Sequence, residues 1–249
     1  MKWSWKLVRI AGIDVYMHAT FLLLIGWVGF THWIEQRSLT AVLGGIGFIL
    51  LLFLLVVAHE YGHALTARRF GIRTRDITLY PIGGVARLER MPEKPIEELW
   101  VALAGPAVNV VIAAGLFAWL WVQGALVPLD QLTVSTGSLA ERLLVVNVSL
   151  FLFNLIPAFP MDGGRILRAI LVQKFPKEKA TAIAAKISDA VYSFGVQDVL
   201  IPLCDLEFKI ASPSNHLVCR CFVNSAFDVG TRKDTRNMTG GGYHSVAVL

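Results

Sequence analysis

Charged residues are scarce in this chain. Only 16% of its 249 residues are Asp, Glu, Lys or Arg, and 55% are hydrophobic, whereas globular chains carry about 25% charged residues. The charges are also unevenly spaced and leave long windows that contain none. This composition excludes an ordinary water-soluble domain and predicts a membrane protein with several spans.

Cysteine is nearly missing as well. The three cysteines, Cys204, Cys219 and Cys221, all lie near the C-terminus. The apolar part of the chain therefore has no disulfide framework.

Internal repeats and polar residues at the middle of a span are also missing, which argues against a small-solute transporter. The net charge of +5 comes from Lys and Arg between the apolar runs, so we expect a lipid bilayer and no nucleic acid as partner.

Four apolar segments are long enough to cross a bilayer core of ~30 Å, which needs about 20 helical residues. They are Tyr16–Trp33, Ala41–Ala58, Leu99–Val122 and Leu139–Pro160, and the second continues as a helix to Phe70. No clear cleavage site follows the first segment, so we interpret it as a span. The expected fold is an all-α polytopic membrane protein with about four transmembrane helices.

Positive charge gathers at three places along the chain. These are the N-terminal end, the loop after His63 and the stretch after Asp162, whereas the connections at 34–40 and 123–138 offer only Arg37. Because cytoplasmic loops carry the excess of Lys and Arg, these three places face the cytoplasm. The sequence predicts a plasma or inner membrane protein in which His63 and Asp162 lie toward the cytoplasmic side.

The loop from Ile72 to Met91 is unusual for a membrane protein. Its sequence "DITLYPIGGVARLER" has β-branched and aromatic residues around Pro81 and a Gly83-Gly84 pair, which predicts a short β-hairpin. The hairpin could lie plainly on the surface. Alternatively, it dips toward the membrane and offers an unpaired edge, in which case protein or water must cover its backbone.

The sequence "HEYGH" carries the clearest chemistry. On a helix, His59 and His63 project from one face and can bind one metal ion, with Glu60 between them. A zinc ion lowers the pKa of bound water from 15.7 to about 7, and a neighbouring carboxylate can accept the proton. The pattern alone is modest evidence, but ionisable residues at a membrane span are functional by default.

A catalytic zinc needs three protein ligands, and Asp162 in "FNLIPAFPMDGGRILRAIL" is the candidate for the third. It could instead cap the helix that follows, but its predicted depth, equal to that of His63, favours the ligand. Asn154 either joins two helices by a hydrogen bond or donates to a substrate carbonyl. In "AGPAVN", the small residues predict close helix packing, and Asn109 is at most a supporting residue.

Taken in order, "HEYGH", "YPIGGVA", "AGPAVN" and "FNLIPAFPMDGGRILRA" resemble the site-2 protease family (peptidase family M50) of intramembrane zinc metalloproteases, in particular its archaeal and bacterial branch with CBS domains. The resemblance implies that His59, His63 and Asp162 bind one zinc ion and that Glu60 is the catalytic acid and base. It also implies a substrate that is a transmembrane segment of another protein, such as an anti-sigma factor or another membrane-tethered regulator. Residues 78–86 could hold the unwound substrate by β-addition.

The resemblance covers residues 1–188, which we predict to form a membrane-embedded metalloprotease core. Residues 189–249 have no apolar window of about 20 residues and no βαβ pattern of a CBS domain, and we predict a loosely ordered, atypical tail. The alternative function is a catalytically inactive membrane scaffold. Such a scaffold leaves the intact Glu60 unexplained.

Overall fold

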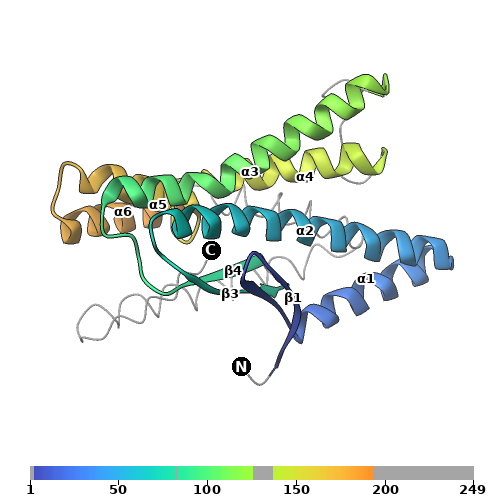
Figure 1. The fold of residues 1–249 in the computed structure, drawn as a ribbon. Coiled ribbons are helices and arrows are strands. Elements are labelled where there is room, and N and C mark those ends of the chain that lie inside the picture. The colour runs from blue at the N-terminus through green and yellow to red at the C-terminus, as the bar shows by residue number, and fades with distance from the viewer. Residues whose placement is uncertain (1–2, 82, 126–136, 193–249) are drawn as a thin grey trace.

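The computed structural model describes residues 3–81, 83–125 and 137–192, which form helices and one small sheet (Figure 1). The four helices that were predicted to be spans are all present. They are α1 (Thr20–Gln36), α2 (Leu39–Arg69), α3 (Pro95–Val122) and α4 (Leu139–Asn154). Two short helices follow, α5 (Asp162–Val172) and α6 (Lys177–Val191).

Among the described residues, only α2 and α3 are long and apolar enough to cross a membrane alone. With 17 and 16 residues, α1 and α4 fall short of the roughly 20 residues that a span needs. The predicted fourth span is broken after Asn154, and the chain turns around Pro157 and Pro160 before α5 begins. The structure therefore supports a mostly helical fold with two candidate membrane spans, and four spans stay a prediction.

The prediction of an all-α fold was wrong at the N-terminus, because the sheet has four strands. Strand β1 (Ser4–Ile10) pairs antiparallel with β2 (Ile13–His18), β2 runs parallel to β3 (Thr74–Tyr80), and β3 pairs antiparallel with β4 (Gly83–Leu88). The parallel pair is possible because α1 and α2 form the crossover between β2 and β3. Residues 16–18, which were assigned to the first span, thus belong to a strand.

The predicted hairpin is confirmed as β3 and β4. Of residues 78–86, which were expected to offer an unpaired edge, only those in β4 lie at an edge of the sheet. Strand β3 lies inside the sheet between β2 and β4. Among the described residues, β4 has a partner on one side only, so its other edge is open.

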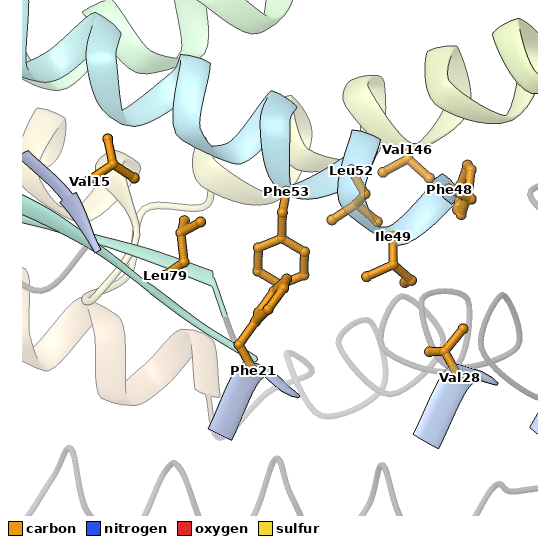
Figure 2. Packing of buried hydrophobic residues seen from close by; sticks show 9 residues of the cluster. All are labelled: Val15, Phe21, Val28, Phe48, Ile49, Leu52, Phe53, Leu79 and Val146. Carbon is orange, nitrogen blue, oxygen red and sulfur yellow. The ribbon is translucent and has the colours of Figure 1, made fainter. Parts of the chain in front are cut away.

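The long helix α2 lies between α3 and the sheet and contacts both (Figure 1). Its apolar face joins α1, α4 and the strands in one buried cluster, in which Phe21 meets Phe53 edge to face (Figure 2). A second buried cluster, in which Ala64 of α2 packs with Ile77 of β3 and Ala86 of β4, holds the last turns of α2 beside the hairpin. On the far side α5 packs on α3. Apart from residues 189–192, which end α6 or follow it, the predicted tail lies outside the described residues.

Candidate metal centre

The two histidines of the "HEYGH" sequence project from the last turns of α2 toward the start of α5. The Nε2 atoms of His59 and His63 are 3.1 Å apart, and each is 3.1 Å from Oδ2 of Asp162. All three side chains are buried. Ligand atoms at 2.0–2.1 Å from a tetrahedral zinc are about 3.3 Å from one another. The triangle of donor atoms therefore has the size of three corners of a zinc site, and it can hold a metal ion.

The local structure around Asp162 directs its carboxylate to the histidines. Met161 is the N-cap of α5, and the Asp162 side chain makes no capping hydrogen bond. Side chains at Gly163 and Gly164 would collide with the backbone of residues 155–159, so both glycines allow α5 to start against that turn. Although burial opposes ionisation, the nearby imidazoles hold the pKa of the Asp162 carboxyl well below its usual range. Asp162 is therefore a carboxylate, the form that binds metal ions.

The other ring nitrogen of His63 determines which nitrogen faces the cluster. Nδ1 lies 2.6 Å from the carbonyl oxygen of Val101 in α3. Because a carbonyl only accepts, Nδ1 carries the proton of the neutral ring and Nε2 keeps its lone pair. That lone pair faces an Asp162 oxygen that also only accepts. Such a contact is favourable when a cation lies between the two atoms, either a metal ion or the second proton of the ring, and the convergence of His59 on the same oxygen fits a metal ion.

Helix α3 supplies no ligand, but it forms one wall of the cluster. A Cβ atom at Gly105 would meet the Nε2 atoms of both His59 and His63. On α2, a Cβ at Gly62, the residue before His63, would lie 2.6 Å from the carbonyl oxygen of Ala104 in α3. Close packing of "AGPAVN" against α2 is thus confirmed at Ala104. Gly105 has a second effect, since its missing side chain leaves the space beside the donor atoms open.

Glu60 lies between the cluster and the hairpin. Its side chain is buried, and within the described structure its Oε2 atom has no hydrogen-bond partner. A Cβ atom at Gly84 in β4 would come within 2.8 Å of Glu60 Cγ and 3.2 Å of Oε1. The strand with the open edge therefore passes directly beside the carboxylate.

The family of the chain follows from its match to the sequence profile of a known family. The profile of peptidase family M50 matches residues 47–142 and 130–194, a stretch that contains both halves of the cluster. The chain belongs to peptidase family M50. The match starts within α2 and ends just after α6, so it includes every element that positions the three donor atoms.

Several M50 relatives are similar to the chain over most of its length. A zinc metalloprotease of Methanocaldococcus jannaschii is 38% identical over 191 residues, which are 77% of this chain and 52% of that protein. Stage IV sporulation protein FB of Bacillus subtilis is 31% identical over 152 residues, 61% of this chain and 49% of that protein. The chain thus spans about half the length of these curated relatives. Among solved structures, a site-2 protease from Methanocaldococcus jannaschii matches 81% of this chain and 88% of its own, with a TM-score of 0.56 and 37% identity.

Not every residue of the M50 motifs that we expected at the site contacts it. The Asn154 amide donates to the Leu150 carbonyl in its own helix at 3.0 Å, and no contact with the cluster supports its predicted catalytic role. The Asn109 side chain is buried without a hydrogen-bond partner in the described structure. Its backbone carbonyl accepts a hydrogen bond from Asn147 of α4, so this position joins two helices.

Arg165 and Arg168 contributed to the sequence analysis only as positive charges of the stretch after Asp162. In the structure, both point toward acidic side chains of the protein. Arg165 is buried one turn after Asp162. Burial lowers the pKa of its guanidinium, and the carboxylates of Asp162, Glu98 and Glu60 oppose the shift. The Nε and Nη2 atoms of Arg168 both donate to Glu98 of α3. Nothing in the sequence pairs Arg168 with Glu98, because the pairing depends on how α5 packs on α3.

Proposed function

We propose that this chain is the catalytic core of an intramembrane zinc endopeptidase, which cuts peptide bonds in or near transmembrane segments of membrane-tethered proteins. One observation carries the proposal: the donor atoms of His59, His63 and Asp162 converge at the end of an apolar helix. Beside them is the Glu60 carboxylate, whose Oε2 atom has no hydrogen-bond partner in the part of the chain that the structure describes. Membership of family M50 supports the reaction class.

In this proposal His59, His63 and Asp162 hold one zinc ion. When bound, zinc polarises the substrate carbonyl and makes water a nucleophile at neutral pH. Glu60 accepts the proton of the attacking water and returns it to the leaving amine. Its Oε2 atom, buried and without a hydrogen-bond partner among the described residues, is the acceptor for that proton. The Val101 carbonyl holds the His63 ring in the orientation that directs Nε2 toward the cluster.

Tryptophans support a position of the cluster within the apolar layer. Trp100 and Trp119 on α3 are 57% and 59% exposed, and tryptophans gather at membrane interfaces. The 19 positions between them correspond to a helical rise of about 28 Å, close to the ~30 Å of a bilayer core. Gly105 lies five positions after Trp100, about 7.5 Å along the helix. We place the cluster at that depth, on the side where Arg68 and Arg69 end α2, which we assign to the cytoplasm of a plasma or inner membrane.

The open edge of β4 suggests how a substrate is held. A peptide bond within a helix is shielded by its own hydrogen bonds, so the substrate must unwind locally. An unwound segment that pairs with β4 would gain backbone hydrogen bonds and would lie beside Glu60, because β4 passes that side chain at Gly84. For the same reason, replacing Gly84 with proline is a poor test, since the new side chain would displace Glu60 itself.

The substrate class in this proposal is a single membrane-spanning segment of a regulator, for example of an anti-sigma factor. Such a substrate explains why water-consuming chemistry is carried out at a membrane helix. An inactive scaffold is the competing function, and the Glu60 side chain distinguishes the two.

The first experiment is the zinc content of the purified chain in detergent. We expect about one zinc ion per wild-type chain and a sharp loss in Asp162→Ala, because Asp162 is the ligand from the distant segment. The control is His32→Gln, which removes an imidazole of α1 outside the cluster and should keep the zinc. Little zinc in a folded wild-type chain would overturn the metal site.

The second experiment tests catalysis. Cells that express wild type or Glu60→Gln are compared by mass spectrometry of new protein termini in the membrane and soluble fractions. We expect termini from membrane segments only with the wild type, while Glu60→Gln keeps its zinc and accumulates the uncut proteins. Equal sets of termini in both samples would favour the inactive scaffold.

A further inference from the structure

A groove lies between the end of α2 and the first half of α3. Its volume is about 320 Å³, and its lining is mostly apolar. The lining residues from α2 and its C-terminal cap are Thr66, Arg69 and Phe70, and those from α3 are Trp100, Leu103, Ala104 and Ala107. The mechanism proposed above uses none of these side chains.

The groove has a polar end and an apolar end. Arg69 and Trp100 lie at the end of α2 and near the start of α3, at the level that we assign to the membrane interface. From Trp100 to Ala107 the helix rises by about 10 Å toward the middle of the apolar layer. Over that distance the lining on α3 changes from an indole to Leu103 and two alanines.

The charge at the polar end is available to a ligand. Arg69 is exposed, and within the described part of the chain it makes no ion pair, whereas its neighbour Arg68 donates to the Ala11 carbonyl. The Thr66 hydroxyl, one turn earlier on α2, also has no hydrogen bond there. A guanidinium and a hydroxyl at one end of an apolar groove match a phosphate group that carries a hydrocarbon chain.

We infer that this groove is a binding site for an anionic phospholipid. The lipid phosphate lies against Arg69 and Thr66, and part of one acyl chain lies along Leu103, Ala104 and Ala107. A free phosphate ion would leave the apolar half of the groove without a partner. The inference rests on the membrane position of α2 and α3 and not on catalysis.

The groove and the metal centre share the same pair of helices. Ala104 lines the groove, and its carbonyl oxygen is the atom that prevents a side chain at Gly62. The next residue, Gly105, faces the histidines from the other side of α3. A lipid in the groove therefore supports the helix contact on which the three donor atoms depend.

Native mass spectrometry of the full chain in detergent tests the site, with phosphatidylglycerol and phosphatidylcholine as probes. We expect one retained phosphatidylglycerol per chain. Arg69→Gln should weaken its retention about fivefold, the contribution of one basic side chain near an anionic head group. Arg75→Gln, which removes an exposed charge on β3 away from the groove, should not change retention.

A second pair of variants tests the apolar end. Ala107→Phe fills the groove and should lower retention of phosphatidylglycerol. Val111→Phe places the same ring one turn farther along the exposed face of α3 and should not. Equal losses in Arg69→Gln and Arg75→Gln, or in the two Phe variants, would mean ordinary annular lipid and overturn the inference. Equal stabilisation by inorganic phosphate would overturn it too. Zinc content, measured on the same samples, checks that each variant is folded and reports separately on the metal centre.

Discussion

Gly105 offers the sharpest test of how α3 forms the metal centre. In Gly105→Ala, the new methyl carbon would lie 2.7 Å from His59 Nε2 and closer still to His63 Nε2. To reach an ordinary contact of 3.4 Å, the His59 nitrogen would have to move by about 0.7 Å, the difference between 3.4 and 2.7 Å. Metal–ligand distances tolerate only about 0.2 Å. We therefore expect zinc affinity to fall by at least tenfold to a hundredfold, the range seen for lost supporting contacts.

The assay is a titration of purified protein with a zinc chelator, with Gly115→Ala as the control. Gly115 lies on the same helix, and a Cβ atom there meets nothing within 4 Å. In both variants alanine favours the helix by about 1 kcal/mol over glycine, so helix propensity cannot explain a loss in Gly105→Ala alone. If Gly105→Ala binds zinc as tightly as wild type, the assigned position of α3 beside the histidines is wrong.

Two further predictions concern the neighbours of the cluster. Gly62→Ala would place a methyl carbon 2.6 Å from the Ala104 carbonyl oxygen, and we expect this overpacking to cost about 1–3 kcal/mol in thermal unfolding in detergent. Gly47→Ala on the same helix, where a Cβ meets nothing within 4 Å, should cost nothing. In a chain without its three native cysteines, Val85→Cys on β4 should form a disulfide with a cysteine placed in a cut substrate segment, and Arg75→Cys on β3 should not. Equal cross-linking at both positions would rule out pairing along the β4 edge.

The donor set could be predicted from the sequence because its parts are local. Two histidines at helical spacing share a face whatever the tertiary structure. The prolines and glycines around Asp162 mark a break in an apolar segment, which brings a carboxylate to a helix end. The structure brings the three side chains together. Assignment of His59, His63 and Asp162 as zinc ligands and of Glu60 as the proton acceptor stays a prediction until the variants are measured.

The sheet could not be predicted fully, because a buried strand and a lipid-facing helix are both apolar. The segment "IDVYMH" has every second residue buried at its start, with Ile13 and Val15 facing the core, but it runs directly into the apolar residues of α1. Hydropathy alone therefore placed Tyr16 in a span. The position of Gly105 beside the two histidines could not be predicted either, because helical periodicity does not show at which residues α3 crosses α2.

The long separation in sequence between the donor residues has a consequence for how the protein is made. Asp162 follows His63 by 99 positions and His59 by 103. At a synthesis rate of about 5–20 residues per second, the ribosome needs roughly 5–20 s after His63 before it adds the carboxylate. During this time the two histidines have no third ligand, and the α3 wall is itself still being inserted. A nascent chain is therefore expected to acquire its metal only after α5 has been made.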